Sequence, residues 1–401
     1  MHFPSIDRFR AILAWTVVAT HITWHTGLSQ AYPKFGIIVQ FGHIAVMVFI
    51  IISGFVITNL LLTTNESYFT YIKRRALRLF PAYLICLVFG MLTTFLTYDA
   101  LTQLWGAGSI QGIDLQAQKA SLVGDNFNWH VLAHMFLLQG IIPDDTLYYS
   151  QMMFLETAWS LSLEWQFYLV APLLIACLRS SRAYMSTASV LLLVLLYTLD
   201  SKHVFGNFAL PSFLPGIAIY FAIGILTRLY YDKSRRTAVY ALNLCVMSIA
   251  CVSLTRFELQ PVVIWFGFIF LTSADWLPVQ TLVSRPFAAK ISNMLDRLGK
   301  CSYSTYLVHV PVIQLAIYIS VSIFGLGMWG TAGFVLMFST PVILAFSSLL
   351  YDYVERPAIA YGKGHGVSGP LPGLARAAAR RHGISADRVS RRMPDDRQAA
   401  E

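Results

Sequence analysis

Long apolar segments recur along this chain, and they restrict what it can fold into more than any other feature. A helix that crosses a bilayer needs about 20 apolar residues, and about ten segments approach that length. Only 12% of the residues are charged, whereas a soluble domain carries about 25%. An ordinary water-soluble enzyme and a disordered chain are therefore excluded, and we predict an all-α, polytopic membrane protein with about ten transmembrane helices. The expected spans cover residues 9–29, 41–63, 79–98, 151–178, 184–200, 209–230, 237–255, 260–276, 302–325 and 330–354.

Lysine and arginine are unevenly distributed between the segments that link these spans. If the N-terminus is cytoplasmic and ten helices alternate, 25 of the 29 basic residues lie in cytoplasmic segments. Such a bias follows the positive-inside rule and predicts that both termini are cytoplasmic. The net charge of +9 comes from residues scattered between apolar segments, so the lipid bilayer is an expected partner and nucleic acid is not.

Three segments outside the spans differ in composition from the rest. Residues 99–150 form the longest expected external stretch, which is suited to shaping an outward-facing acceptor site. Residues 284–298 look amphipathic, and we expect them along the inner membrane surface. The C-terminal stretch is rich in Gly, Ala, Pro and Arg. We therefore expect a membrane domain over residues 1–361 and a disordered cytoplasmic tail over residues 362–401.

The first expected span carries a cation and two imidazoles, which are costly inside a membrane and usually functional. Arg10 and His21 are eleven positions apart, which is about three helical turns, so both project from nearly the same face about 16 Å apart. This stripe suits a long ligand whose anionic head stays at the cytoplasmic surface while its other end reaches the imidazole. An interface anchor at Arg10 and a hydrogen-bonded packing role for His21 would give the same pattern.

His25 lies one turn beyond His21, and the two histidines could in principle hold a metal ion. No Cys, Asp or Glu nearby in the sequence completes a ligand set, so no metal is expected. We expect His25 to line the outer mouth of a site or to pack against an aromatic neighbour.

After the second span, the segment KRRALR places Arg75 and Arg78 three residues apart, on one side of a helix. Paired guanidinium groups suit phosphate oxygens through charge-assisted, bidentate hydrogen bonds. A cluster of this kind at a membrane edge is also typical of a topology signal. The second span itself contains Gly54, where a small residue would allow close contact between helices.

Glu164 lies in an apolar segment with no basic residue near it in the sequence, and a buried carboxylate needs a partner. We expect that partner to be His21, whose imidazole the carboxylate would orient and whose protonated form it would stabilise. A purely structural hydrogen bond to a neighbouring helix is the alternative. His309 is a further histidine inside an expected span.

Six ordered segments between residues 6 and 357 resemble the acyltransferase-3 family of bacterial integral-membrane O-acyltransferases. The segment IDRFRAILAWTVVATHITWH is similar to the opening pattern of that family, in which Arg or Lys precedes His by ten intervening residues. The other segments are FIIISGFVIT (49–58), RRALRLFPAY (74–83), AWSLSLEWQFYLVAPLL (158–174), LGKCSYSTYLVHVP (298–311) and YDYVERP (351–357). Any one of these is weak evidence, whereas the ordered set is specific.

The resemblance implies transfer of an acyl group, often acetyl, from cytoplasmic acyl-CoA to a hydroxyl of an extracytoplasmic sugar at a bacterial inner membrane. It implies that CoA phosphates are bound by Arg10, Arg75 and Arg78. His21 would be the general base or a brief acyl carrier, and Glu164 would orient it. The candidates for an acceptor or secondary site are His25, Ser302, Tyr303 and His309.

Two other classes of protein stay open at this point. A proton-coupled glycan transporter or flippase would use His21, Glu164 and His309 as a proton relay, although the sequence has no internal repeat of the kind that marks many transporters. A non-catalytic membrane partner would make the spacing of Arg10 and His21 a coincidence. The sequence does not specify the acceptor sugar, the length of the acyl group, direct transfer against an acyl-enzyme, or the oligomeric state.

Overall fold

The computed structural model describes residues 4–124, 126–180, 182–232, 237–254, 259–273 and 286–364, and these residues contain helices and no strand. The predicted all-α class is therefore confirmed for the described residues. The predicted tail over 362–401 lies almost entirely outside them. The principal helices are α1 (Pro4–His25), α2 (Leu28–Ala31), α3 (Gly36–Thr63), α4 (Tyr68–Trp105), α5 (Ile110–Val123), α6 (Phe127–Met135), α7 (Ala158–Leu178), α8 (Ala183–Asp200), α9 (Ala218–Tyr231), α10 (Thr237–Leu254), α11 (Leu259–Ser273), α13 (Pro286–Lys300), α14 (Ser302–Tyr318), α15 (Met328–Leu350) and α16 (Arg356–Gly362).

Each of the ten predicted spans overlaps one of these helices. Within the described residues, six helical segments are long and apolar enough to cross a membrane, and three shorter apolar helices accompany them. The chain is thus a helical membrane protein, and ten crossings with cytoplasmic termini stay a prediction. The fourth span differs from its predicted bounds, because α7 begins at Ala158 and residues 151–157 form turns. Phe154, with φ of 59°, adopts a left-handed backbone conformation there that ends regular structure.

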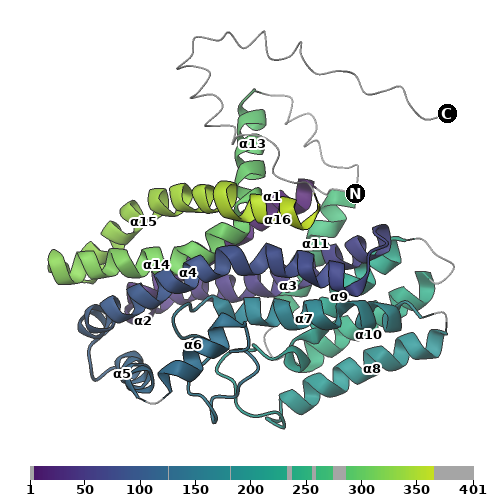
Figure 1. The fold of residues 1–401 in the computed structure, drawn as a ribbon, viewed down its shortest axis with the longest axis horizontal. Coiled ribbons are helices and arrows are strands. Elements are labelled where there is room, and N and C mark those ends of the chain that lie inside the picture. The colour runs from purple at the N-terminus through teal and green to yellow at the C-terminus, as the bar shows by residue number, and fades with distance from the viewer. Residues whose placement is uncertain are drawn as a thin grey trace.

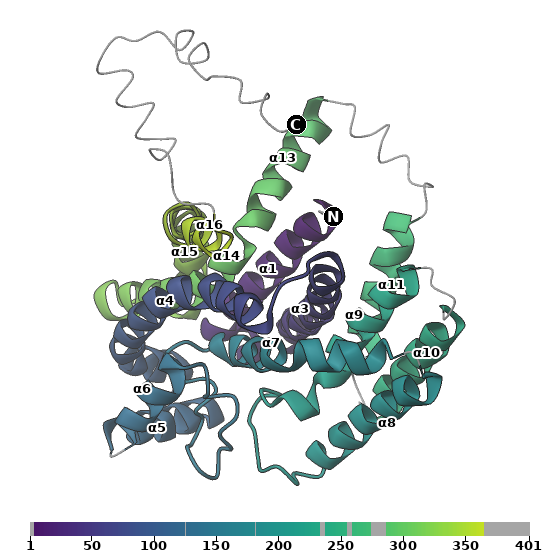
Figure 2. The same cartoon turned by 45° about the vertical axis from the view of Figure 1, so that its right-hand side comes forward.

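Helix α1 lies near the middle of the molecule, with α3, α14 and α13 packed against it (Figure 2). Helix α4 crosses the bundle beside α14, and α9 packs against the opposite side of α3 (Figure 1). The apolar core lines these contacts, with Met47, Ile51 and Val48 of α3 fully buried. This arrangement surrounds the polar face of α1 with helices rather than leaving it toward lipid.

The close approach of α3 and α9 depends on two glycines, one in each helix, and each glycine lies against the backbone of the other helix. A Cβ atom on Gly54 would lie 2.2 Å from the carbonyl oxygen of Phe221, and one on Gly224 would lie 2.0 Å from that of Ile51. Both distances are far below van der Waals contact, so only glycine fits at either position. The close helix contact predicted at Gly54 is confirmed.

Two segments flank the bundle at its ends. Helix α13 runs across the direction of α4 (Figure 1) and is tied to α1 by Arg8, whose Nε donates to Asp296 Oδ1 at 2.6 Å. Helices α5, α6 and α2 all lie at the left end of the molecule in Figure 1. The predicted amphipathic segment is therefore a helix, and its place on the inner membrane surface stays a prediction.

Candidate functional site

The predicted arginine ligands converge on one cavity of about 430 Å3. Arg10 enters it from α1, and Arg75 and Arg78 enter it from α4, with Lys300 and Lys363 also on its wall. The Nε atoms of Arg10 and Arg75 are buried and have no hydrogen-bond partner among the described residues. Buried donors without a partner are costly, so a cavity lined by them is suited to an anionic ligand. We call it the basic cavity.

Neighbouring cations of the KRRALR segment have a different role. Arg74 pairs with Glu66 at 2.5 Å, and its Nε donates to the carbonyl oxygen of Gly362 in α16. Lys73 lies over the ring of Tyr361, 5.7 Å from its centroid. The basic residues of this segment therefore lie on two sides of α4. Lys73 and Arg74 contact α16, whereas Arg75 faces the basic cavity.

Glu164 also lines the basic cavity, and the predicted pair of Glu164 with His21 is not formed. Its Oε1 accepts a hydrogen bond from Ser53 of α3 at 2.8 Å and another from Tyr168 on its own helix. Glu164 is thus held by Ser53 in the cavity that the arginines line. The alternative of a hydrogen bond to a neighbouring helix is the one that the structure contains.

Two further residues predicted for an acceptor or secondary site, Ser302 and Tyr303, lie at the basic cavity as well. The hydroxyl of Tyr303 donates to the carbonyl oxygen of Leu79 at 2.8 Å. Glu355, from the closing ERP segment, is buried in the same wall and accepts a hydrogen bond from Ser304 at 2.8 Å. Three carboxylates, on Asp7, Glu164 and Glu355, therefore balance part of the cavity's positive charge.

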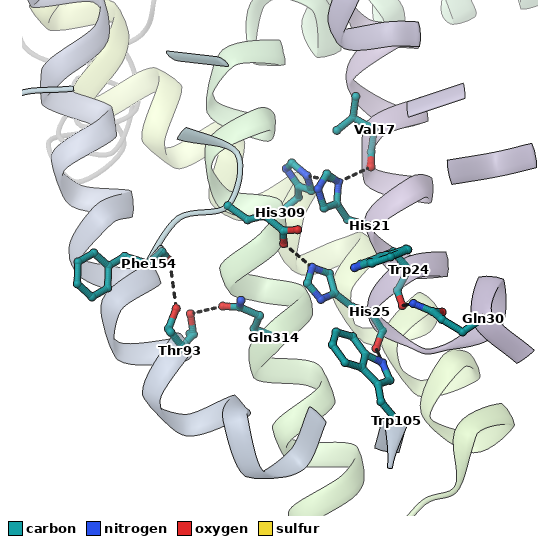
Figure 3. Close-up of polar contacts among 12 residues, drawn as sticks. Val17, His21, Trp24, His25, Gln30, Thr93, Trp105, Phe154, His309 and Gln314 are labelled. Carbon is teal, nitrogen blue, oxygen red and sulfur yellow. Dashed lines mark hydrogen bonds and ion pairs between the residues drawn. The ribbon is translucent and has the colours of Figure 1, made fainter. Parts of the chain in front are cut away.

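Three histidines form a cluster farther along α1 (Figure 3). The ring of His21 lies 4.9 Å from that of His309 in α14 and 5.9 Å from that of His25. Ring contacts also connect the cluster to the basic cavity, because Tyr306 lines that cavity and its ring lies 5.8 Å from His309. The predicted residues His21, His25 and His309 are thus brought together.

Hydrogen bonds define the neutral tautomers of two of these rings. Nδ1 of His309 lies 3.1 Å from the carbonyl oxygen of Thr305, and Nδ1 of His21 lies 3.0 Å from that of Val17. A carbonyl oxygen only accepts, so each Nδ1 carries a proton. Nε2 of His309, 3.3 Å from Nδ1 of His21, is then the second acceptor of that one proton, which it shares with the Val17 carbonyl oxygen. Nε2 of the half-buried His21 is left with a lone pair, as a general base requires.

Glu156 is the carboxylate that sequence reasoning missed. Its Oε2 lies 2.9 Å from Nε2 of His25, and its side chain is only 17% exposed. Burial would raise the pKa of Glu156, but His25, with smaller contributions from His21 and His309, lowers that pKa below its usual range. The one available signal was an acidic residue in an otherwise apolar stretch just before α7. Within the described residues, no three His, Cys, Asp or Glu side chains are arranged to hold a metal ion.

An all-helical membrane protein with buried guanidinium groups at one end of a helix and an oriented imidazole three turns along it has the parts of a membrane-bound group-transfer enzyme. Comparison with known families gives the same class. Residues 3–349 match the family described as "Acyltransferase domain", so the chain belongs to the acyltransferase-3 family.

Two curated relatives illustrate this similarity. The chain is 26% identical over 345 residues to the peptidoglycan O-acetyltransferase OatA of Listeria monocytogenes, covering 78% of this chain and 50% of that protein. It is 27% identical over 345 residues to the O-acetyltransferase OatA of Staphylococcus aureus, covering 78% of this chain and 51% of that protein. The chain spans about half the length of these curated relatives. No solved structure matches it significantly.

Proposed function

We propose that this protein transfers an acyl group, acetyl by preference, from cytoplasmic acyl-CoA to a hydroxyl of an extracytoplasmic carbohydrate at a bacterial inner membrane. The observation that carries the proposal is the basic cavity, in which Arg10, Arg75 and Arg78 converge at the start of the helix that bears His21. CoA is a long ligand with phosphates at one end and a thioester at the other. Guanidinium groups would bind the phosphates by charge-assisted hydrogen bonds, and the pantetheine arm would extend toward the histidine cluster.

The histidine cluster would supply the base. As the acceptor hydroxyl oxygen attacks the thioester carbon, its proton passes to Nε2 of His21. The C–S bond then breaks, and the CoA sulfur leaves as a thiol with the proton that His21 returns. His309 would stabilise the imidazolium by accepting the hydrogen bond from Nδ1 of His21. Attack by Nε2 itself, to give an acyl-histidine, uses the same atom and stays an alternative within this proposal.

A carbohydrate acceptor agrees with the name of the Listeria relative, which refers to peptidoglycan. Glu164 would act at the donor end, because it shares the basic cavity with the arginines. In this proposal the donor is recognised at one end of α1, in the basic cavity, and the acid–base step takes place farther along α1, at the histidine cluster.

The test is an incubation of the purified full chain with acetyl-CoA labelled in the acetyl group, with and without extracted envelope glycan. The proposal predicts release of free CoA and transfer of label to the glycan, both dependent on His21. Label that never leaves acetyl-CoA in the presence of glycan and correctly folded protein would contradict it.

A further inference from the structure

A second cavity, of about 120 Å3, lies on the other side of the histidine cluster. Three elements enclose it: the end of α1 with Trp24 and His25, the end of α4 with Trp105, and α5, which covers it with Asp114 and other polar side chains. The turn segment before α7 closes the inner wall with Glu156. Figure 3 shows the His25 and Trp105 rings beside each other, below His21. We call this the outer cavity.

Charge separates the outer cavity from the basic cavity. No lysine or arginine lines the outer cavity within the described part of the chain, and two carboxylates, Asp114 and Glu156, do. Phosphate groups of CoA or of lipid headgroups would meet two carboxylates there and no lysine or arginine. The occupant is therefore neutral or cationic, and it is chemically different from the anion that the basic cavity suits.

The remaining lining consists of aromatic rings and amides. Trp24, Trp105 and Tyr149 present ring surfaces, and Gln111 and Gln118 of α5 present both donors and acceptors. Aromatic ring surfaces can pack against the C–H faces of a ligand ring, and neighbouring amides can hydrogen-bond to hydroxyl groups at the edges of that ring. A drug-sized ligand needs about 300–1,000 Å3, so the outer cavity suits a single ring.

Two features of the outer cavity wall are costly for folding. Tyr149 and Phe154, both on its wall, have φ of 54° and 59°, in the left-handed region that residues other than glycine rarely adopt. His25 is 4% exposed, and its Nδ1 has no hydrogen-bond partner among the described residues. Backbone strain and unpartnered buried polar atoms are features that cluster at functional sites.

We infer that the outer cavity binds one uncharged, hydroxyl-bearing sugar ring, stacked on Trp105 and held at its hydroxyls by Asp114 and the amides of α5. This inference rests on the proposed function and deepens it, because it specifies where the acceptor lies and which class of sugar it is. Glu156 fixes the ring of His25 at the inner wall. A hydroxyl of the bound sugar then faces the histidine cluster rather than the basic cavity.

Saturation-transfer NMR on the purified full chain in nanodiscs tests the site without requiring turnover. The probes are the methyl β-glycosides of glucose, galactose and N-acetylglucosamine, with glucose 6-phosphate as the anionic comparison. At least one neutral glycoside should bind, and glucose 6-phosphate should bind at least about tenfold more weakly. Trp105→Leu and Asp114→Asn should each weaken the neutral glycoside about tenfold or more, the usual effect of losing a ring surface or a hydrogen bond to a charged group.

Matched controls lie in the same region outside the cavity. Trp129 is 65% exposed on α6, and the Asp99 side chain is 89% exposed, paired with Lys119. Trp129→Leu and Asp99→Asn should leave glycoside binding unchanged, and all four variants should bind acetyl-CoA like the unmodified protein. Absence of binding by every neutral glycoside, or binding that Trp105→Leu and Asp114→Asn leave unchanged, overturns the inference.

Failure of this inference and failure of the proposed function give different results. If the glycoside binds with the predicted variant pattern but no acetyl group is transferred to glycan, the outer cavity is supported and the proposed activity is wrong. If acetyl transfer occurs but both cavity variants keep the KM for glycan, the activity is supported and the outer cavity is not the acceptor site.

Discussion

Oε2 of Glu156 lies 2.9 Å from Nε2 of His25, one helical turn from His21, whereas Glu164 lies in the basic cavity. Two acidic residues only eight positions apart in the sequence thus serve opposite ends of the site. The pair at Glu156 restrains the ring that stacks on His21. The carboxylate at Glu164 is hydrogen-bonded by Ser53 instead.

This division predicts different kinetic effects for two matched substitutions. Glu156→Gln should lower kcat about tenfold to a hundredfold and leave the KM for acetyl-CoA unchanged, because it frees the His25 ring without altering the basic cavity. Glu164→Gln should mainly change the KM for acetyl-CoA, because it removes negative charge beside the arginines. Steady-state kinetics with acetyl-CoA as the varied substrate separate the two effects. Identical kinetic effects of both substitutions would contradict the division.

The two arginines of α4 should determine donor affinity. Arg75→Ala and Arg78→Ala each remove charge-assisted hydrogen bonds worth about 1.5–3 kcal/mol, which is about tenfold or more in Kd. Lysine at either position should restore affinity only in part, because an ammonium group cannot form the bidentate fork. Calorimetric titration of the purified variants with CoA measures this.

Arg74→Ala is the control for this comparison, because Arg74 pairs with Glu66, which precedes α4, and lies outside the basic cavity. Its CoA affinity should equal that of the unmodified protein. If Arg75→Ala and Arg78→Ala also bind CoA normally, the cluster serves topology alone.

Helix packing at the glycine pair should be intolerant of a single methyl group. Gly54→Ala places a Cβ atom 2.2 Å from the Phe221 carbonyl oxygen, so α3 and α9 must separate. We expect a loss of about 1–3 kcal/mol, seen as a lower thermal unfolding midpoint in detergent. Gly267→Ala in α11 is the control, because a Cβ atom there meets nothing within 4 Å. Equal midpoints for the two variants would refute the predicted close contact.

Membrane orientation is testable with reporter fusions. Fusions after Arg78 and Lys300 should report a cytoplasmic location, and a fusion at His203 should report an external one, as the positive-inside rule predicts. An external location for Arg78 would move the basic cavity away from cytoplasmic CoA and would contradict donor binding there.

Helical segments could be predicted from the sequence because they follow from short-range regularities, whereas the common role of Arg10, Arg75 and Arg78 was implied by the family resemblance. Apolar length identifies a helix, and three-residue or eleven-residue spacing places side chains on one face. The partner of Glu164 could not be predicted in this way, because it depends on the depth at which α7 begins beside α3. Glu156 was missed because it belongs to turns with a left-handed Phe154, where no periodicity reports which way a side chain points.

The most direct measurement compares acetyl transfer by His21→Ala and His25→Ala, with acetyl-CoA binding measured on the same preparations. The two histidines are one turn apart on one helix, so a general need for polarity would make them equivalent. Loss of a general base costs about 10²–10⁴-fold in rate. We predict that His21→Ala abolishes detectable transfer while still binding acetyl-CoA, and that His25→Ala retains measurable turnover with weaker acceptor binding. Full activity in His21→Ala, with or without loss in His25→Ala, would contradict the assignment of His21 as the base.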